Sequence, residues 1–191
     1  MESIEARLAE RLRALRLDRS LTLEGLAERA GVSRSMISVI ERGASSPTAQ
    51  VLDKLSVALG VTLASLFAAP ARDEADPLRR RADQVSWRDP ATGYVRRNLS
   101  PPGFPSPLEL VEVSLPPGAR VVYDTGPRTP AVHQQVWILD GAVDLSVGET
   151  THALAAGDCL AMRVDQPVAF HNRTEAGARY LVALTTGEPA R

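Results

Sequence analysis

The sequence predicts an α-helical domain followed by an all-β domain, because the spacing of apolar residues changes once along the chain. Over residues 1–69, apolar residues recur at intervals of three and four, which is the period of an amphipathic helix. From residue 86 onward, short segments of alternating polarity are separated by proline and glycine turns, which is typical of a β-sandwich or barrel. Residues 70–85 hold two prolines, acidic residues and three consecutive arginines, so we expect a mobile linker there. The predicted domains are therefore 1–69 and 86–191.

Length and composition fit this division and exclude several classes of protein. The chain has 191 residues and a net charge of −1, with an ordinary apolar content, so two small cores are feasible. It shows neither a signal sequence nor an apolar run long enough for a membrane helix, so we expect a cytoplasmic protein without a membrane partner. Its only cysteine, Cys159, can form neither an intramolecular disulfide nor a cysteine-based zinc site, and is predicted to be a small buried residue.

Capping residues and glycines predict five helices in the first domain. They run over about 3–17, between Thr22 and Gly31, over 34–42, between Thr48 and Gly60, and over 62–67. Thr22 and Ser33 are expected to cap the second and third helices through their side-chain oxygens. Gly31 ends the second helix, because glycine takes the left-handed conformation at little cost. The second and third helices are thus joined by a turn of about three residues.

This unit carries a family resemblance. Residues 21–43, with the segments 46–48 and 59–61, resemble the phage-repressor-like or XRE family of helix-turn-helix domains, over nearly all of residues 7–67. In that family the third helix enters the major groove of DNA and its first turn reads base edges. The predicted DNA-binding residues are Thr22, Ser33, Arg34, Ser35, Met36, Ser38, Val39 and Arg42. The resemblance implies that Val32, Ile37 and Ile40 hold the helix to the core.

Four residues refine this interpretation. Arg34 begins a helix three residues before a core position, so it projects outward, where its guanidinium can bind guanine or phosphate. The alternative is a small helical interaction domain in which Arg34 is merely solvated. Leu23 stands where the family often has glutamine, so a DNA contact there is expected to be absent. The family also implies a partly buried salt bridge between Arg16 and Glu41.

The second domain resembles the cupin family over about residues 105–185, on the segments His133–Gly141 and Gly157–Asn172. This resemblance implies an antiparallel β-barrel of the double-stranded β-helix type. The predicted strands include 108–115, 134–140, 142–147 and 178–184.

The metal-binding motif of cupins is not retained. Gln134 falls where metal cupins place a glutamate, and Val168 falls where they place the histidine of the second motif. The two remaining ligand positions fall at or beside Arg128 and Pro130. Strand alternation points His133 and His171 away from the barrel interior. The sequence therefore predicts no metal, no cofactor and no enzymatic activity.

Inward-facing positions of the barrel could form an effector pocket or simply fill the core, and both alternatives remain open. The candidate pocket residues are Gln134, Val136, Ile138, Met162, Val168 and Phe170. Arg96 and Arg97 are adjacent, so one could face inward toward a carboxylate ligand and the other outward. Strand alternation places Trp137 on the outward face of the sheet. A large aromatic side chain at such a position favours a dimer interface.

Taken together, these patterns predict a sequence-specific transcriptional regulator that binds a pseudo-palindromic DNA operator as a homodimer. Its metal-free cupin-like domain could bind a small-molecule effector, if the barrel keeps a pocket. Two alternatives remain. One is a cupin enzyme tethered to a DNA-binding domain, and the other is an antitoxin-like module that binds another protein.

Overall fold

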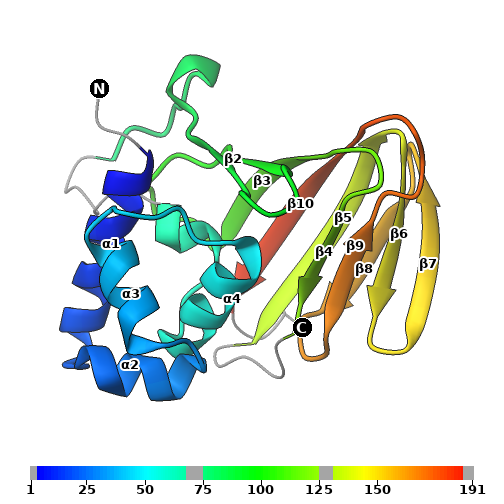
Figure 1. The fold of residues 1–191 in the computed structure, drawn as a ribbon. Helices are drawn as coiled ribbons and strands as arrows, with labels where there is room; N and C mark the ends of the chain where they lie inside the picture. The colour runs from blue at the N-terminus through cyan, green and yellow to red at the C-terminus, as the bar shows by residue number, and fades with distance from the viewer. Residues whose placement is uncertain (1–3, 68–74, 125–130, 187–191) are drawn as a thin grey trace.

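The computed structural model describes residues 4–67, 75–124 and 131–186, which form a helical domain packed against a β-barrel (Figure 1). The predicted order, helices first and strands second, is confirmed. No helix within the described ranges combines the length and the apolar composition needed to cross a membrane.

Over residues 4–67, the helical domain contains four α-helices and one 3-10 turn. They are α1 (Ile4–Asp18), α2 (Leu23–Ala30), α3 (Arg34–Glu41), α4 (Ala49–Ala58) and η1 (Ala64–Phe67). The fifth predicted helix is thus only a four-residue 3-10 turn, a length typical of that tighter helix. Leucine and isoleucine side chains from α1 to α4 share a core in which Leu12, Leu26, Ile37 and Leu52 are almost fully buried.

The helix ends are fixed by the residues that the sequence indicated. The Oγ1 atom of Thr22 accepts a hydrogen bond from the amide of Gly25 (3.0 Å), and the Oγ atom of Ser33 accepts one from Met36 (3.2 Å). Gly31 has a φ of 61° and ends α2 in the left-handed conformation. Because caps and glycine bound the turn on both sides, α2 and α3 are held at a defined angle.

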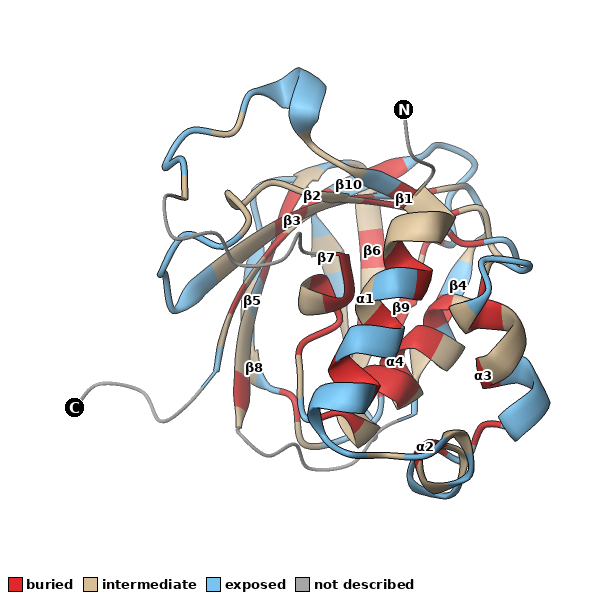
Figure 2. Cartoon of the chain, turned by 90° about the vertical axis from the view of Figure 1, so that its left-hand side faces the viewer, coloured by how far each residue is buried: buried red, intermediate tan, exposed pale blue. Residues whose placement is uncertain are grey.

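Within the described residues, the barrel is built from ten strands in two antiparallel sheets. The strands are β1 (Ser86–Arg88), β2 (Val95–Asn98), β3 (Leu108–Leu115), β4 (Arg120–Tyr123), β5 (Val132–Asp140), β6 (Ala142–Val147), β7 (Thr150–Ala155), β8 (Cys159–Arg163), β9 (Val168–His171) and β10 (Ala178–Thr186). One sheet has the order β1-β2-β3-β10-β5-β8 and the other β4-β9-β6-β7. Buried positions alternate with more exposed ones along strands such as β5 and β10, and Figure 2 colours the residues by burial. The buried side chains form the core between the two sheets.

The helical domain packs directly on the barrel. Trp87 of β1 is 2% exposed and lies between Phe67 (ring centroids 5.7 Å apart) and Tyr94 (5.8 Å). The buried carboxylate of Asp89 accepts a hydrogen bond from the amide of Ala49, the first residue of α4 (3.0 Å). Figure 1 shows α4 on the side of the helical domain that faces the barrel, where it contacts β4. The two domains therefore form a continuous packed unit.

Polar contacts reinforce this junction. The hydroxyl of Thr62 donates to the carboxylate of Glu109 on β3 (2.8 Å). The side-chain amide of Asn98 on β2 donates to the carbonyl of Ala64 (3.2 Å). In the described part of the predicted linker, residues 75–85, the chain forms the 3-10 turn η2 (Arg81–Asp83). Contacts that come from both domains, rather than the linker alone, therefore fix how they sit together.

Candidate functional site

The first candidate site is the exposed face of α3. Arg34, Ser35 and Met36 form its first turn and are solvent-exposed, whereas Ile37 and Ile40 on the opposite side are almost fully buried. Ser38 and Val39 are half-buried beside this face. Met36 is 41% exposed, so an apolar side chain lies among the polar ones on this face. The helix is thus anchored on one side and offers a mixed basic and apolar surface on the other.

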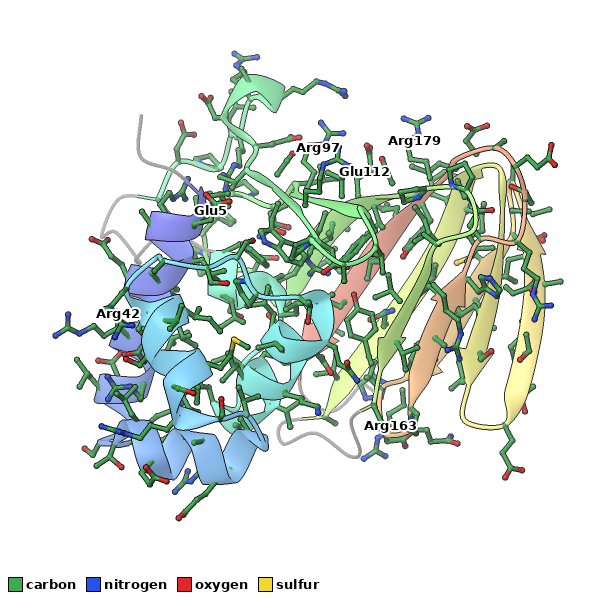
Figure 3. The ribbon with its side chains drawn as sticks, in the orientation of Figure 1. Glu5, Arg42, Arg97, Glu112, Arg163 and Arg179 are labelled. Carbon is green, nitrogen blue, oxygen red and sulfur yellow. The ribbon has the colours of Figure 1, made fainter. Side chains whose placement is uncertain are left out.

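Arginine side chains flank this face. Arg34 is largely exposed and its Nε atom lies 3.7 Å from the carboxylate of Glu24 on α2. Arg42 follows the end of α3 and extends outward from the domain (Figure 3), while its Nη1 atom donates to the hydroxyl of Ser38 (2.6 Å). Thr22 is exposed at the start of α2. These guanidinium groups are free to reach an anionic partner such as a phosphate backbone.

A buried ion pair ties α3 to α1. The Nε and Nη2 atoms of Arg16 donate to the two carboxylate oxygens of Glu41, at 2.7 and 2.8 Å, and the two side chains are only 10% and 8% exposed. Arg16 also donates to the carbonyl of Leu21 (2.8 Å), at the entry to α2. The hydrogen bond from Arg16 to Glu41 raises the pKa of Arg16, although burial acts in the opposite direction. One guanidinium therefore connects α1, α2 and α3.

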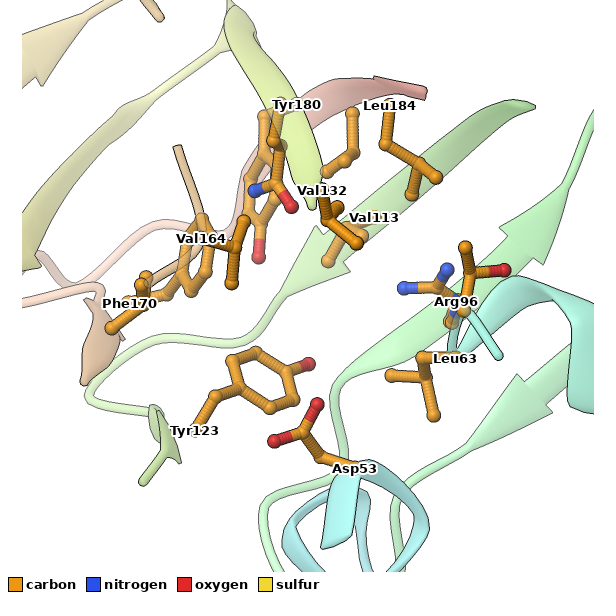
Figure 4. A pocket seen from close by; sticks show the side chains of 14 residues that line it. Asp53, Leu63, Arg96, Val113, Tyr123, Val132, Val164, Phe170, Tyr180 and Leu184 are labelled. Carbon is orange, nitrogen blue, oxygen red and sulfur yellow. The ribbon is translucent and has the colours of Figure 1, made fainter. Parts of the chain in front are cut away.

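The second candidate site is a cavity between α4 and the barrel, with a volume of about 70 Å³ (Figure 4). Asp53 on α4, Thr62 and Leu63 form the wall on the side of the helical domain. Strands of both sheets form the rest of the wall. Its remaining lining residues are Arg96, Val113, Tyr123, Val132, Gln134, Val164, Val168, Phe170, Tyr180, Val182 and Leu184.

Polar groups converge on this mostly apolar cavity. The guanidinium of Arg96 and the hydroxyls of Tyr123 and Tyr180 point into it (Figure 4). Tyr94 lies behind the wall, with its hydroxyl 3.1 Å from that of Tyr123. All three tyrosines of the chain therefore gather here. Motif analysis of the sequence missed this cluster, because the three residues lie on elements far apart in the chain.

Burial keeps these phenols protonated. It raises the pKa of Tyr94 above its ordinary value, although the nearby Arg96 lowers it. It raises the pKa values of Tyr123 and Tyr180 further, and the other tyrosines nearby add to the effect. At neutral pH each hydroxyl is therefore neutral and can donate a hydrogen bond.

Only part of the predicted pocket set lines this cavity. Gln134, Val168 and Phe170 do so. Val136 and Ile138 lie further along β5 and are fully buried in the core, and Met162 is half-buried against the core rather than in the cavity wall. The prediction was too broad because strand alternation shows which residues face inward but not where the packing leaves space.

The adjacent arginines Arg96 and Arg97 lie on opposite faces of β2. Arg96 is 6% exposed and lines the cavity. Arg97 faces the other way and forms an ion pair with Glu112 on β3 (2.7 Å; Figure 3), with a further hydrogen bond to Gln84 (3.0 Å). The inward arginine that the sequence suggested is thus Arg96, whereas Arg97 is covered by neighbours rather than solvated.

The cavity residues do not fit a cupin metal centre. Gln134 and Val168, at two of the ligand positions of metal cupins, both line the cavity, and neither supplies an anionic or imidazole donor. His133 and His171 are half-buried and do not line it. No cluster of three or more histidine, cysteine, aspartate or glutamate residues suited to a metal occurs in the part of the chain that the structure describes. Arg128 and Pro130 lie outside the described residues.

The outer face of the six-stranded sheet carries an exposed apolar area. Trp137 on β5 is 48% exposed and is paired with Leu181 on β10 and Cys159 on β8. Cys159 is exposed, so the prediction that it is buried was wrong. It lies on an edge strand, where alternate side chains face away from the core. We call Cys159, Trp137 and Leu181, with Ala161 and Ala183 beside them, the outer-sheet patch.

Comparison with known proteins finds relatives along the whole chain. Residues 12–66 match the family model for helix-turn-helix domains, HTH_3. The HTH-type transcriptional regulator SutR of Escherichia coli (strain K12) is 29% identical over 92% of both chains. An HTH_3 family transcriptional regulator from Vibrio cholerae has a crystal structure that matches with a TM-score of 0.75, at 25% identity over 98% of each chain.

A cupin domain has also been solved from an XRE family transcriptional regulator of Enterobacter cloacae. It matches 51% of this chain and 98% of its own length, at 18% identity and a TM-score of 0.42. The likeness to the regulators from E. coli and V. cholerae spans both domains.

Proposed function

We propose that this chain, an XRE-type helix-turn-helix transcriptional regulator with a C-terminal cupin domain, binds its operator as a homodimer. We also propose that the cavity beside α4 holds a small effector. The observation that carries the DNA-binding part is the face of α3, with Arg34, Ser35 and Met36 exposed over an anchored helix. A regulator of chromosomal DNA acts in the cytoplasm, where we place the chain.

The residues of α3 divide into two roles in this proposal. Arg34 reads a guanine edge through its guanidinium, and Met36 contacts a thymine methyl group or another apolar base edge. The backbone amides at the start of α3, together with Ser33, Thr22 and Arg42, contact phosphates and set the register. The ion pair of Arg16 and Glu41 keeps α3 at a fixed angle, which direct readout of bases requires.

Replacing Arg34 with alanine is expected to weaken operator binding by about 1 to 3 kcal/mol and to relax the preference at one base position. The measurement is a fluorescence-anisotropy titration at fixed salt, on an operator that is first identified by sequencing the genomic fragments that the purified protein retains. Arg120→Ala, at an exposed site on the barrel, is the matched control and should bind normally. Unchanged affinity and base preference in the Arg34 variant would refute its assigned role.

We propose that the outer-sheet patch forms the dimer interface. A solvent-facing tryptophan beside Leu181 and Cys159 is costly in water and supplies a large contact area at low conformational cost. A patch of this kind on one sheet can pair with its own copy about a two-fold axis. Two such chains would present two α3 helices to half-sites about one helical turn apart.

Replacing Trp137 with glutamate is expected to convert the dimer into a monomer, because two carboxylates would be desolvated against each other. Light scattering coupled to gel filtration would then report a mass of 20.5 kDa in place of twice that value. Leu78→Glu, at an exposed apolar site outside the patch, should leave the mass of the dimer unchanged. A dimer that persists in the Trp137 variant would place the interface elsewhere.

We also propose that the barrel does not catalyse a reaction. The relative that matches over 92% of this chain and the solved structure that matches with a TM-score of 0.75 are both transcriptional regulators. Gln134 and Val168 replace two of the metal-binding side chains of cupins, and none of the described residues that line the cavity is a histidine or a cysteine. The cavity instead has the composition of a binding site, with an apolar wall and a few polar groups that face its interior.

A further inference from the structure

We propose that the cavity binds a small organic monocarboxylate, whose carboxylate group pairs with Arg96 and whose short apolar part contacts the barrel wall. This inference deepens the proposed function, since it assigns a ligand class and a mode of regulation to the effector site. It rests on the geometry of Arg96, on the hydroxyl groups beside it and on the walls of the cavity.

Arg96 is a buried cation with unused hydrogen-bond donors. It is 6% exposed, and its Nε and Nη2 atoms have no hydrogen-bond partner among the residues that the structure describes. The same two atoms of Arg16 hold both oxygens of Glu41, at 2.7 and 2.8 Å. An arginine uses this pair of nitrogens to bind a carboxylate bidentately. The unused side of Arg96 therefore has the shape of a carboxylate site.

The neighbouring hydroxyls suit the same ligand. Tyr123 and Tyr180 face the cavity beside Arg96, and burial keeps both phenols neutral through their raised pKa values. A neutral phenol donates a hydrogen bond to a carboxylate oxygen that the guanidinium leaves unsatisfied. Gln134, on β5 beside the strand that carries Tyr180, adds an amide donor. Together with Arg96, these side chains offer more hydrogen-bond donors than a single water molecule could accept.

The remaining walls select an organic monoanion. Valine, leucine and phenylalanine side chains line most of the cavity, and such a wall stabilises the alkyl part of a ligand but not the hydration shell of sulfate or phosphate. A volume of 70 Å³ accommodates about five to seven water-sized atoms, which is the size of a three- to five-carbon acid. The carboxylate of Asp53 in the same wall disfavours a second negative charge on the ligand.

The ligand would contact both domains at once. Arg96 belongs to the barrel, whereas Asp53, Thr62 and Leu63 belong to the helical domain. A bound acid therefore favours the arrangement in which α4 closes on the barrel, provided that this arrangement binds it more tightly than others do. Operator affinity and carboxylate affinity should then change each other by the same factor.

The test is a calorimetric titration of the full-length protein, without DNA, using propionate, butyrate, isobutyrate and isovalerate. We expect saturable binding of at least one acid, and none of isobutyramide, which has the same shape as isobutyrate without the charge. Arg96→Met should weaken binding by at least about tenfold, because it removes hydrogen bonds to a charged group. The same variant should raise the melting temperature of the ligand-free protein, because it removes a buried charge whose Nε and Nη2 donors are unsatisfied.

Two further variants keep the test decisive. Arg120→Met also removes one positive charge from the barrel, at an exposed site, and should bind the acid normally. Arg96→Lys keeps the charge but loses the paired N–H groups, so it should also bind the acid at least about tenfold more weakly. This variant provides the test if Arg96→Met does not fold. Absence of binding for every acid, equal binding by the Arg96 variants, or binding of sulfate or phosphate as tight as that of the acids would overturn the assignment.

The titration is independent of the proposed DNA-binding function. If the acids do not bind but the protein still selects one operator, the ligand assignment fails and the regulator stands. If the acids bind while genomic fragments are retained without sequence preference, the DNA-binding proposal fails and the ligand assignment stands. Operator affinity that is the same with and without saturating acid would overturn the coupling between the two sites.

Discussion

Replacing Trp87 with alanine is expected to lower the free energy of unfolding by about 4 kcal/mol, the largest loss from a single side chain that we predict. Trp87 is 2% exposed, and its ring contacts Phe67 of the helical domain and Tyr94 of the barrel. Its Nε1 atom donates to the hydroxyl of Ser46, which precedes α4 (3.3 Å). The truncation thus removes apolar burial, two aromatic contacts and a hydrogen bond from one junction.

Removing the Trp87 side chain should also change the shape of the unfolding curve. While the junction is intact, we expect the domains to unfold together, because the contacts between them contribute to the stability of both. Without Trp87 the urea transition should separate into two steps, one for each core. Circular dichroism at helix and strand wavelengths would follow the two steps. Phe104→Ala removes an exposed aromatic ring and should change the stability by less than about 0.5 kcal/mol.

A loss below about 1 kcal/mol for the Trp87 variant, with a single transition, would contradict this account of the junction. It would mean that α4 and η1 stay on the barrel through their polar contacts alone. The hydrogen bonds of Thr62 to Glu109 and of Ala49 to Asp89 would then carry the coupling. The same result would weaken the case for communication between the cavity and α3, since that case needs packed domains.

The fold could be predicted from the sequence where local signals decide it. Thr22, Ser33 and Gly31 placed the ends of α2 and α3 within a residue, because caps and left-handed glycines act through their immediate neighbours. The strands β3 and β6 agree with the predicted bounds, since alternation and turn residues mark both of their ends. The fifth helix was shorter than predicted, because local signals do not distinguish one 3-10 turn from a short α-helix.

The cavity was less predictable than the face of α3. The spacing of Ile37 and Ile40 identifies the buried face of α3, and the exposure of Arg34 follows because it lies on the other face. A cavity depends on where packing is incomplete between elements distant in the sequence, such as α4, β2 and β10. The sequence could suggest that one of the adjacent residues Arg96 and Arg97 faces inward. The three tyrosines and Asp53 could not be assigned to one site without the fold.

The packing of the two domains was also hidden in the sequence. The linker prediction treated residues 1–69 and 86–191 as independent units, because the segment between them has few residues that could enter a core. The contacts that join them come from Ser46, Ala49, Thr62 and Phe67, which lie within the helical domain itself. Each of these residues also has an ordinary role in a helical fold. Nothing in their local pattern distinguishes a junction from a core or a cap.

Replacing Glu41 with alanine is expected to lower the free energy of unfolding by about 3 kcal/mol, because it leaves the buried guanidinium of Arg16 without its carboxylate. The side chains of Arg16 and Glu41 are 10% and 8% exposed, so water cannot easily take the place of the lost partner. Urea denaturation of the full chain measures the change. Glu24→Ala is the matched control, because its ion pair with Arg34 is largely exposed and should contribute less than about 0.5 kcal/mol.

The double variant Arg16→Met with Glu41→Leu separates the two possible causes of such a loss. If the penalty comes from an uncompensated charge, the double variant should be more stable than the Glu41→Ala single variant, since no charge remains buried. It should still be less stable than the native chain, because the carbonyl of Leu21 loses its donor. A double variant as unstable as the sum of the two single replacements would instead mean that each side chain acts separately, and that the pair does not fix the angle of α3.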